Sequence, residues 1–122
     1  MRSLLLGAAL IVTSAPYAFA GDEIMTNYFG NTVIAQSKLG ISKVHYRANH
    51  TFGGTAAGPA GEVQLSGSWK IDGSGQLCRS YEHAPPGSPN PFCTPWESHK
   101  VGDTWTMSAE GQTAQVSLVA GK

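Results

Sequence analysis

The four histidines are the side chains best suited to chemistry, because imidazole binds copper and zinc well. They are His45, His50, His83 and His99. His45 and His50 lie five positions apart, so on one continuous strand their side chains face opposite sides of the sheet, and a bend near Asn49 is needed to bring them together. His83 and His99 lie on either side of the proline-rich stretch 84–95 and can approach each other across the base of the loop that it forms. Two interpretations stay open: a copper or zinc site, and ordinary surface or hydrogen-bonded histidines.

Sequence patterns for hydrolytic catalysis are absent. The chain contains neither a Gly-x-Ser-x-Gly elbow nor a His-Glu-x-x-His pair. Its glycine-rich segments lack the Lys-Ser or Lys-Thr ending of a phosphate-binding loop. An active site that these absences leave open is a pair of carboxylates, which the fold would have to bring together. The acidic candidates are Glu62, Glu82, Glu97 and Asp103. The sequence thus predicts a protein that is not an enzyme and needs no cofactor.

The N-terminal segment has the order of a secretory signal peptide. A short positive start at Arg2 precedes an apolar run over 4–12, and a more polar stretch ends in Ala18-Phe19-Ala20. This order predicts export and cleavage after Ala20. The apolar run is about half the roughly 20 residues that a membrane-spanning helix needs. We therefore expect a periplasmic or secreted protein of residues 21–122, with no membrane span after signal cleavage.

Cys78 and Cys93 are the only cysteines, and an even number in an exported chain favours a disulfide. A bridge between them closes a loop of about 15 residues, which in the chain-entropy model stabilises the fold by about 3 kcal/mol. The alternative is a redox or metal-binding pair. Thiol oxidoreductases use the much closer Cys-x-x-Cys spacing, and a zinc site needs more ligands than this pair supplies.

The loop between the cysteines is rich in proline, with five prolines within 84–95. Because proline fixes φ and lacks the N–H, this segment is excluded from helices and sheet interiors, and we predict a stiff surface loop. A stiff loop loses little entropy on binding, and aromatic side chains anchor partners well. The predicted partner-binding residues are Tyr81, Glu82, His83, Phe92 and Trp96. The alternatives are that the loop is a plain connector and that Trp96 folds back to cap the barrel end.

Short β-rich runs alternate with turn residues along 21–122, and no window has a sustained helical period. Val44 and Tyr46 alternate with Lys43 and His45, which predicts a half-buried strand. The Gly- and Ala-rich segment 53–61, which contains Pro59, is predicted to be a loop. The expected strands are 31–35, 42–48, 51–52, 63–71, 76–81, 104–109 and 113–119.

This pattern predicts one all-β domain, a small antiparallel β-sandwich or barrel of seven to eight short strands with one disulfide. Either arrangement protects the sheet edges of so short a chain. The candidate core residues are Phe52, Leu65, Trp69, Leu77, Trp105, Val116 and Leu118.

One half of the mature chain carries a recognisable series of motifs. They are Gly-Ser-Trp at 67–69, Leu-Cys-Arg at 77–79, Pro-Phe-Cys-Thr-Pro-Trp at 91–96 and His-Lys-Val-Gly-Asp-Thr-Trp at 99–105. The series resembles an uncharacterised family of small exported bacterial proteins, and this resemblance implies a fold and a compartment but no activity. The Gly-x-Trp strand is also weakly similar to lipocalin-like barrels, although there it opens the first strand and here it lies in mid-chain.

The charge pattern narrows the choice of partner. Eight basic residues balance eight acidic ones, and only 13% of the residues are charged. A nucleic-acid surface needs clustered Lys and Arg, so nucleic acid is not expected as a partner. We expect a non-enzymatic binding or interaction protein of the bacterial envelope, with an unknown protein or small ligand as partner. The alternatives are a periplasmic copper- or zinc-binding protein and an inhibitor of an envelope-directed hydrolase.

Overall fold

The structure, a computed structural model, describes residues 21–84, 87–109 and 111–122. The predicted signal peptide, 1–20, lies outside these residues. So do Pro85 and Pro86 of the proline-rich loop and Glu110 of the last hairpin turn.

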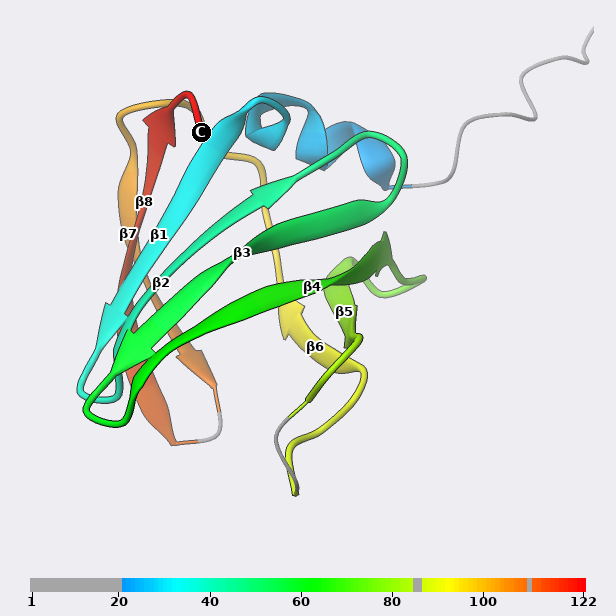
Figure 1. Cartoon of the computed structure of the whole chain (residues 1–122). Coiled ribbons are helices and arrows are strands. Elements are labelled where there is room, and N and C mark those ends of the chain that lie inside the picture. The colour runs from blue at the N-terminus through cyan, green and yellow to red at the C-terminus, as the bar shows by residue number, and fades with distance from the viewer. Residues whose placement is uncertain (1–20, 85–86, 110) are drawn as a thin grey trace, which may run out of the picture.

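Eight antiparallel strands form a single sheet that curls into a half-barrel (Figure 1). The strands are β1 (Asn31–Ser37), β2 (Gly40–Tyr46), β3 (Thr51–Gly58), β4 (Gly61–Ile71), β5 (Gln76–Tyr81), β6 (Phe92–Pro95), β7 (Thr104–Ala109) and β8 (Gln112–Ala120). Their order in the sheet is β6-β5-β4-β3-β2-β1-β8-β7, so β6 and β7 are the two edges. The all-β prediction is confirmed. Of the two predicted architectures the barrel is the nearer one, because the described residues form one curled half-barrel sheet and not two packed sheets.

The core lies on the concave face of the sheet, where alternate residues of each strand point inward. Val33 of β1 pairs with Val44 of β2, and Tyr46 pairs with Phe52 of β3. The predicted inward face of β2 is therefore correct. The buried core consists of Met25, Tyr28, Val33, Val44, Tyr46, Phe52, Trp69, Leu77, Val116 and Leu118. Leu65 and Trp105 were also expected in the core, and they pack against it while partly exposed.

A short 3-10 helix, η2 (Asp22–Tyr28), closes one end of the half-barrel (Figure 1). Met25 and Tyr28 of this helix are 0% and 1% exposed, and the Tyr28 hydroxyl donates a hydrogen bond to the Glu97 carbonyl over 2.7 Å. The sequence predicted no helix here, because seven residues are too few for a helical period to stand out. Among the described residues, no helix is long and apolar enough to cross a membrane.

The segment 53–61 is not a loop, and here the sequence-based prediction was wrong. All of β3 is extended, and only the two residues between β3 and β4 form a turn. β3 pairs with β2 on one side and with β4 on the other. Pairing on both sides satisfies the backbone groups of this segment, which offsets the low strand propensity of its glycines.

Gly54 permits the close pairing of β2 and β3. Its φ is 157°, and a Cβ added at this position would lie 2.0 Å from the Lys43 carbonyl oxygen. We expect Gly54→Ala to lower the free energy of unfolding by about 1–3 kcal/mol, measured by urea denaturation. Gly73→Ala is the matched control, since a Cβ there meets no atom within 4 Å. Equal stabilities of the two variants would contradict the expected clash.

The proline-rich segment also contains a strand, which the sequence did not predict. Phe92–Pro95 forms β6, paired only with β5. The exclusion of prolines from sheet interiors holds, because β6 is an edge strand and Pro95 ends it. The described remainder of the segment connects β5 to β6 without regular structure.

Candidate ligand-binding cavity

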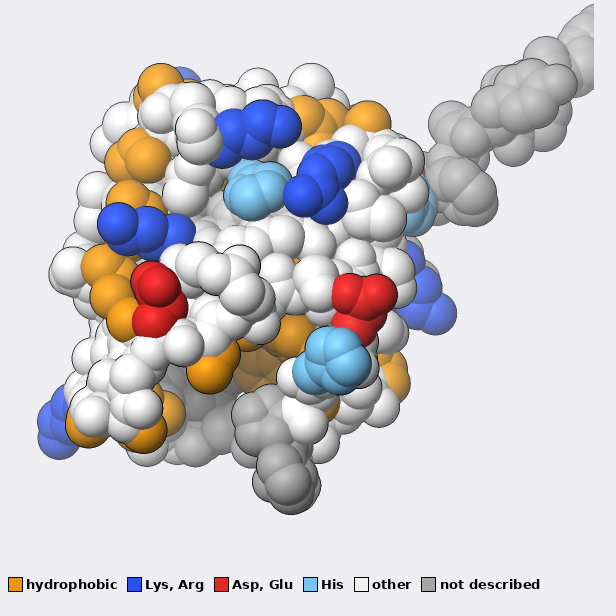
Figure 2. Space-filling model, in the orientation of Figure 1, with side chains coloured by type: hydrophobic (Ala, Val, Ile, Leu, Met, Phe, Trp, Pro, Cys, Tyr) orange, Lys and Arg blue, Asp and Glu red, His pale blue; other side chains and the backbone are white. Residues whose placement is uncertain are grey.

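The concave face of the sheet encloses a cavity of about 580 Å³ whose lining is mostly apolar. It lies against strands β2 to β6 and the proline-rich loop. The lining residues are Ser42, Val44, Ala56, Val63, Gln64, Leu65, Arg79, Tyr81, His83, Ala84, Ser88, Pro89 and Phe92. On the face seen in Figure 2 the lower half is hollowed, and hydrophobic side chains are recessed within the hollow. The volume falls within the range of about 300–1,000 Å³ that small-molecule sites occupy.

The cavity exists because side-chain size changes along the strands. Toward η2, the inward residues Tyr46 and Phe52 are large and fill the interior. Toward the opposite end, the inward residues of the same two strands are Ser42, Gly54 and Ala56. Small side chains leave unfilled space between this part of the sheet and the proline-rich loop that faces it. The half-barrel is thus packed solid at one end and hollow at the other.

The five residues predicted to bind a partner do not form one surface. Tyr81, His83 and Phe92 line the cavity, and of the loop residues Glu82 and His83 are exposed to solvent. Trp96 packs inward, with ring centroids 5.4 Å from Tyr28 and 6.1 Å from Tyr46. Of the two interpretations of Trp96, the structure supports the one in which it folds back against the barrel.

The loop is tied to the cavity wall by a side chain. The Asn90 side chain accepts a hydrogen bond from the Tyr81 amide over 2.9 Å and donates one to the Tyr81 carbonyl over 3.1 Å. These two hydrogen bonds satisfy the N–H and C=O of Tyr81, as a neighbouring strand would at the end of β5. The loop is therefore held beside the cavity mouth.

Arg79 and Thr94 are inward-facing polar residues that no sequence motif marked as candidates. Arg79 pairs with Trp69 on β4 and with Phe92 on β6, and its Nη1 donates a hydrogen bond to the Tyr46 hydroxyl over 3.2 Å. Burial raises the pKa of Tyr46, so its hydroxyl stays protonated at neutral pH. The alternation Leu77, Arg79, Tyr81 was the available signal, because it places Arg79 on the same face as two large apolar residues.

Three of the four histidines have partners of their own. His45 Nε2 lies 3.1 Å from Arg47 Nη2, and burial followed by the Arg47 charge lowers the pKa of His45. His50 Nε2 lies 2.7 Å from an Asp22 carboxylate oxygen. The ring of His50 also stacks on Trp69, with centroids 4.2 Å apart.

His99 is held by an acidic residue and by a ring. Its Nδ1 lies 3.2 Å from Asp103 Oδ2, and it stacks on Trp105 with centroids 3.6 Å apart. A hydrogen bond from the Lys100 amide, and then one from His99, lowers the pKa of the Asp103 carboxyl. A catalytic general acid needs the opposite shift.

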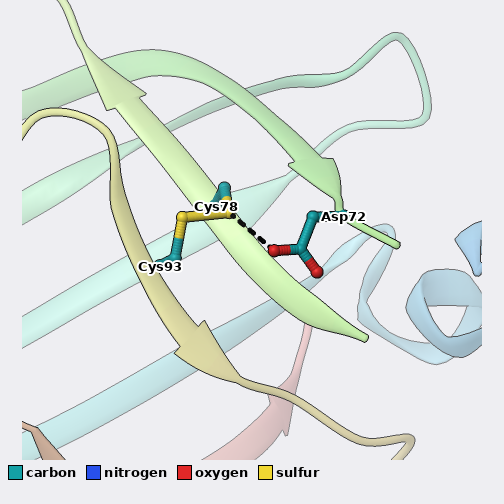
Figure 3. Close-up of side chains that lie close together, drawn as sticks. All are labelled: Asp72, Cys78 and Cys93. Carbon is teal, nitrogen blue, oxygen red and sulfur yellow. Dashed lines mark hydrogen bonds between the residues drawn. A yellow bond between two sulfur atoms is a disulfide. The ribbon is translucent and has the colours of Figure 1, made fainter. Parts of the chain in front are cut away.

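The group of potential metal ligands found among the described residues contains no histidine. It consists of Asp72, Cys78 and Cys93 (Figure 3). Cys78 and Cys93 face each other across β5 and β6 and form the predicted disulfide. An Asp72 carboxylate oxygen lies 3.8 Å from Cys78 Sγ. Because metal binding needs thiolates and both sulfurs are in the disulfide, this group is a structural cross-link.

Comparisons of the chain with protein-family models, with curated proteins and with solved structures found no match.

Proposed function

We propose that this chain is a non-enzymatic binding protein of the bacterial envelope, and that its ligand is a small molecule with an apolar body that occupies the cavity. The observation that carries the proposal is the cavity of about 580 Å³ on the concave face, with its mostly apolar lining. Concave apolar sites with a few convergent polar groups are the usual form of small-molecule sites.

The proline-rich loop has a role in this proposal. Tyr81 and Phe92 supply aromatic surface to the cavity, and the disulfide and Asn90 hold the loop in place. A wall that is already ordered loses little entropy when the ligand binds. Glu82 is exposed and does not line the cavity, so a protein partner could meet it there, whereas the exposed His83 lies at the cavity itself.

Export is part of the proposal because two independent features support it. The order of residues over 1–20 is that of a secretory signal. Disulfides persist in oxidising compartments such as the periplasm, and the structure contains one. The copper or zinc alternative needs several ligands around one ion, and the histidines with described partners engage Arg47, Asp22 and Asp103 instead.

Binding of a neutral apolar dye tests the proposed cavity. We expect the fluorescence of N-phenyl-1-naphthylamine to rise on addition of the protein and to saturate at about one dye per chain. Ala56→Phe fills the cavity from the inner face of β3, and we expect it to weaken dye binding by about tenfold or more.

Thr55→Phe is the matched control, because Thr55 is the neighbouring residue of β3 and points to the opposite face of the sheet. The control is expected to bind the dye as the unchanged protein does. Absence of saturable dye binding by the unchanged protein, or equal weakening by both variants, would rule out the cavity as the ligand site.

A further inference from the structure

A cationic side chain points into the apolar interior of the half-barrel. Arg79 lies on the inner face of β5 and lines the cavity. Its guanidinium carbon lies 5.4 Å from the centre of the Phe92 ring and 6.0 Å from that of Trp96. An arginine stays protonated at all relevant pH values, so the interior carries a full positive charge.

No acidic residue balances this charge in the part of the chain that the structure describes. The ion pairs there join His50 to Asp22, His99 to Glu97 and Asp103, and Lys100 to Asp103. The hydrogen-bond partner of Arg79 is the neutral Tyr46 hydroxyl, and its Nε is buried without a partner. Burying a charge without an opposite one is costly, so an opposite charge supplied by a ligand would stabilise this arrangement.

Two more buried hydrogen-bonding groups face the same side. Thr94 is 3% exposed, and its hydroxyl oxygen has no hydrogen-bond partner among the described residues. The ring nitrogen of Trp96 is also buried without a partner. Phe92, Thr94 and Trp96 alternate along β6 and the residue after it, so all three belong to the inward side. The Trp96 N–H, the Thr94 hydroxyl and the Arg79 guanidinium are hydrogen-bond donors on this inward side, and Arg79 is the one of the three that lines the cavity.

We propose that the ligand is an amphipathic carboxylic acid, whose carboxylate binds Arg79 and whose apolar chain occupies the cavity. This inference rests on the proposed function and names its ligand class. The planar guanidinium matches a carboxylate, and one positive charge balances one negative charge. The apolar chain lies against Val44, Leu65 and Phe92 and reaches the mouth beside Pro89. The anionic group is thus at the inner end of the cavity and the chain extends toward the loop.

The test compares ligands that differ only in the polar group. Decanoic acid, 1-decanol and decyl phosphate each displace the bound neutral dye at pH 7.5, and their dissociation constants are measured. We expect decanoic acid to bind about 10- to 100-fold more tightly than 1-decanol, the range for a charge-assisted hydrogen bond. Equal binding of acid and alcohol would overturn the assignment of a carboxylate. Tighter binding of decyl phosphate than of the acid would replace it with a phosphate.

Arg79→Met keeps an apolar side chain of similar length and removes the charge. We expect this variant to lose the preference for the acid while 1-decanol and the dye bind within about threefold of their original affinity. Arg47→Met is the matched control, since Arg47 is exposed and bonds to Thr51 and His45. It is expected to keep the preference. A preference that survives in Arg79→Met would assign the anion to another residue.

A second measurement needs no variant. The carboxyl of decanoic acid titrates near the ordinary range of about 4–5 for carboxyl groups, whereas Arg79 stays charged. Decanoic acid is therefore expected to bind more tightly than 1-decanol by the full factor at pH 7.5. The ratio of the two dissociation constants falls toward one as the pH falls through that range. A pH-independent ratio would contradict the inference. If the dye, the alcohol and the acid all fail to bind, the cavity function itself fails, which distinguishes the two proposals.

Discussion

Trp69→Ala is expected to lower the free energy of unfolding by about 3–5 kcal/mol. Trp69 is 2% exposed and stands on the inner face of β4. Its ring stacks on His50 and packs 6.0 Å from Phe29, and its Nε1 donates to the Arg47 carbonyl over 2.9 Å. Alanine removes all of these contacts and leaves a cavity in the packed end of the half-barrel. Urea denaturation monitored by circular dichroism measures the change.

Trp105→Ala is the matched control for this variant. Trp105 is only partly buried, on the edge strand β7, and its ring stacks on His99. We expect its loss to cost about 1–2 kcal/mol. A loss at Trp69 no larger than that at Trp105 would mean that the packed end contributes little to stability. The comparison also separates a general effect of removing tryptophan from an effect of position.

The double variant Cys78→Ala, Cys93→Ala is expected to lower the free energy of unfolding by about 2–5 kcal/mol. The bridge closes a loop of 15 residues between directly opposed positions of β5 and β6. β6 is only four residues long, and within the described part of the chain it pairs with β5 alone. Without the bridge, a short edge ladder and the packing of Thr94 and Trp96 hold this strand against the sheet. Chemical denaturation of the oxidised protein and of the double variant measures the difference.

The same variant is expected to weaken ligand binding, because β6 forms one wall of the cavity. Phe92 lines the cavity and Thr94 is buried behind it, and both depend on the position of β6. We expect the affinity for the neutral dye to fall by at least about tenfold. A reducing agent provides the control, since it should weaken binding by the unchanged protein and leave the double variant unaffected. If the reduced unchanged protein and the double variant both bind the dye as tightly as the oxidised protein does, the disulfide does not hold β6 in the position that binding needs.

The sequence alone determined most strand positions and the facing of several strands. β5 and β7 occupy the expected residues, and the turn at 72–75 is where its glycines predict it. Val44 and Tyr46 face the core, as their alternation indicated. The partner of Cys78 was also settled, because the chain has only one other cysteine. These features follow from local rules: a period of two residues, the conformational freedom of glycine in turns, and residue counts.

The tertiary structure decided the features that depend on distant residues. The glycine-rich segment is extended because β2 and β4 pair with it on both sides, and β6 forms because β5 offers it an edge. The helix η2 is held by packing of Met25 and Tyr28 against the sheet. In each case the local sequence preference is weak, and contacts with residues far along the chain supply the stabilisation.

The cavity and the position of Arg79 also belong to the tertiary structure. Small side chains at Ser42, Gly54 and Ala56 create space only because two paired strands, β2 and β3, align them on one concave face. Arg79 is an ordinary charged residue in the sequence, and only the curl of the sheet places it opposite Tyr46. A strand pattern specifies which residues share a face. Strand order and curvature decide what that face encloses, and these depend on the whole sheet at once.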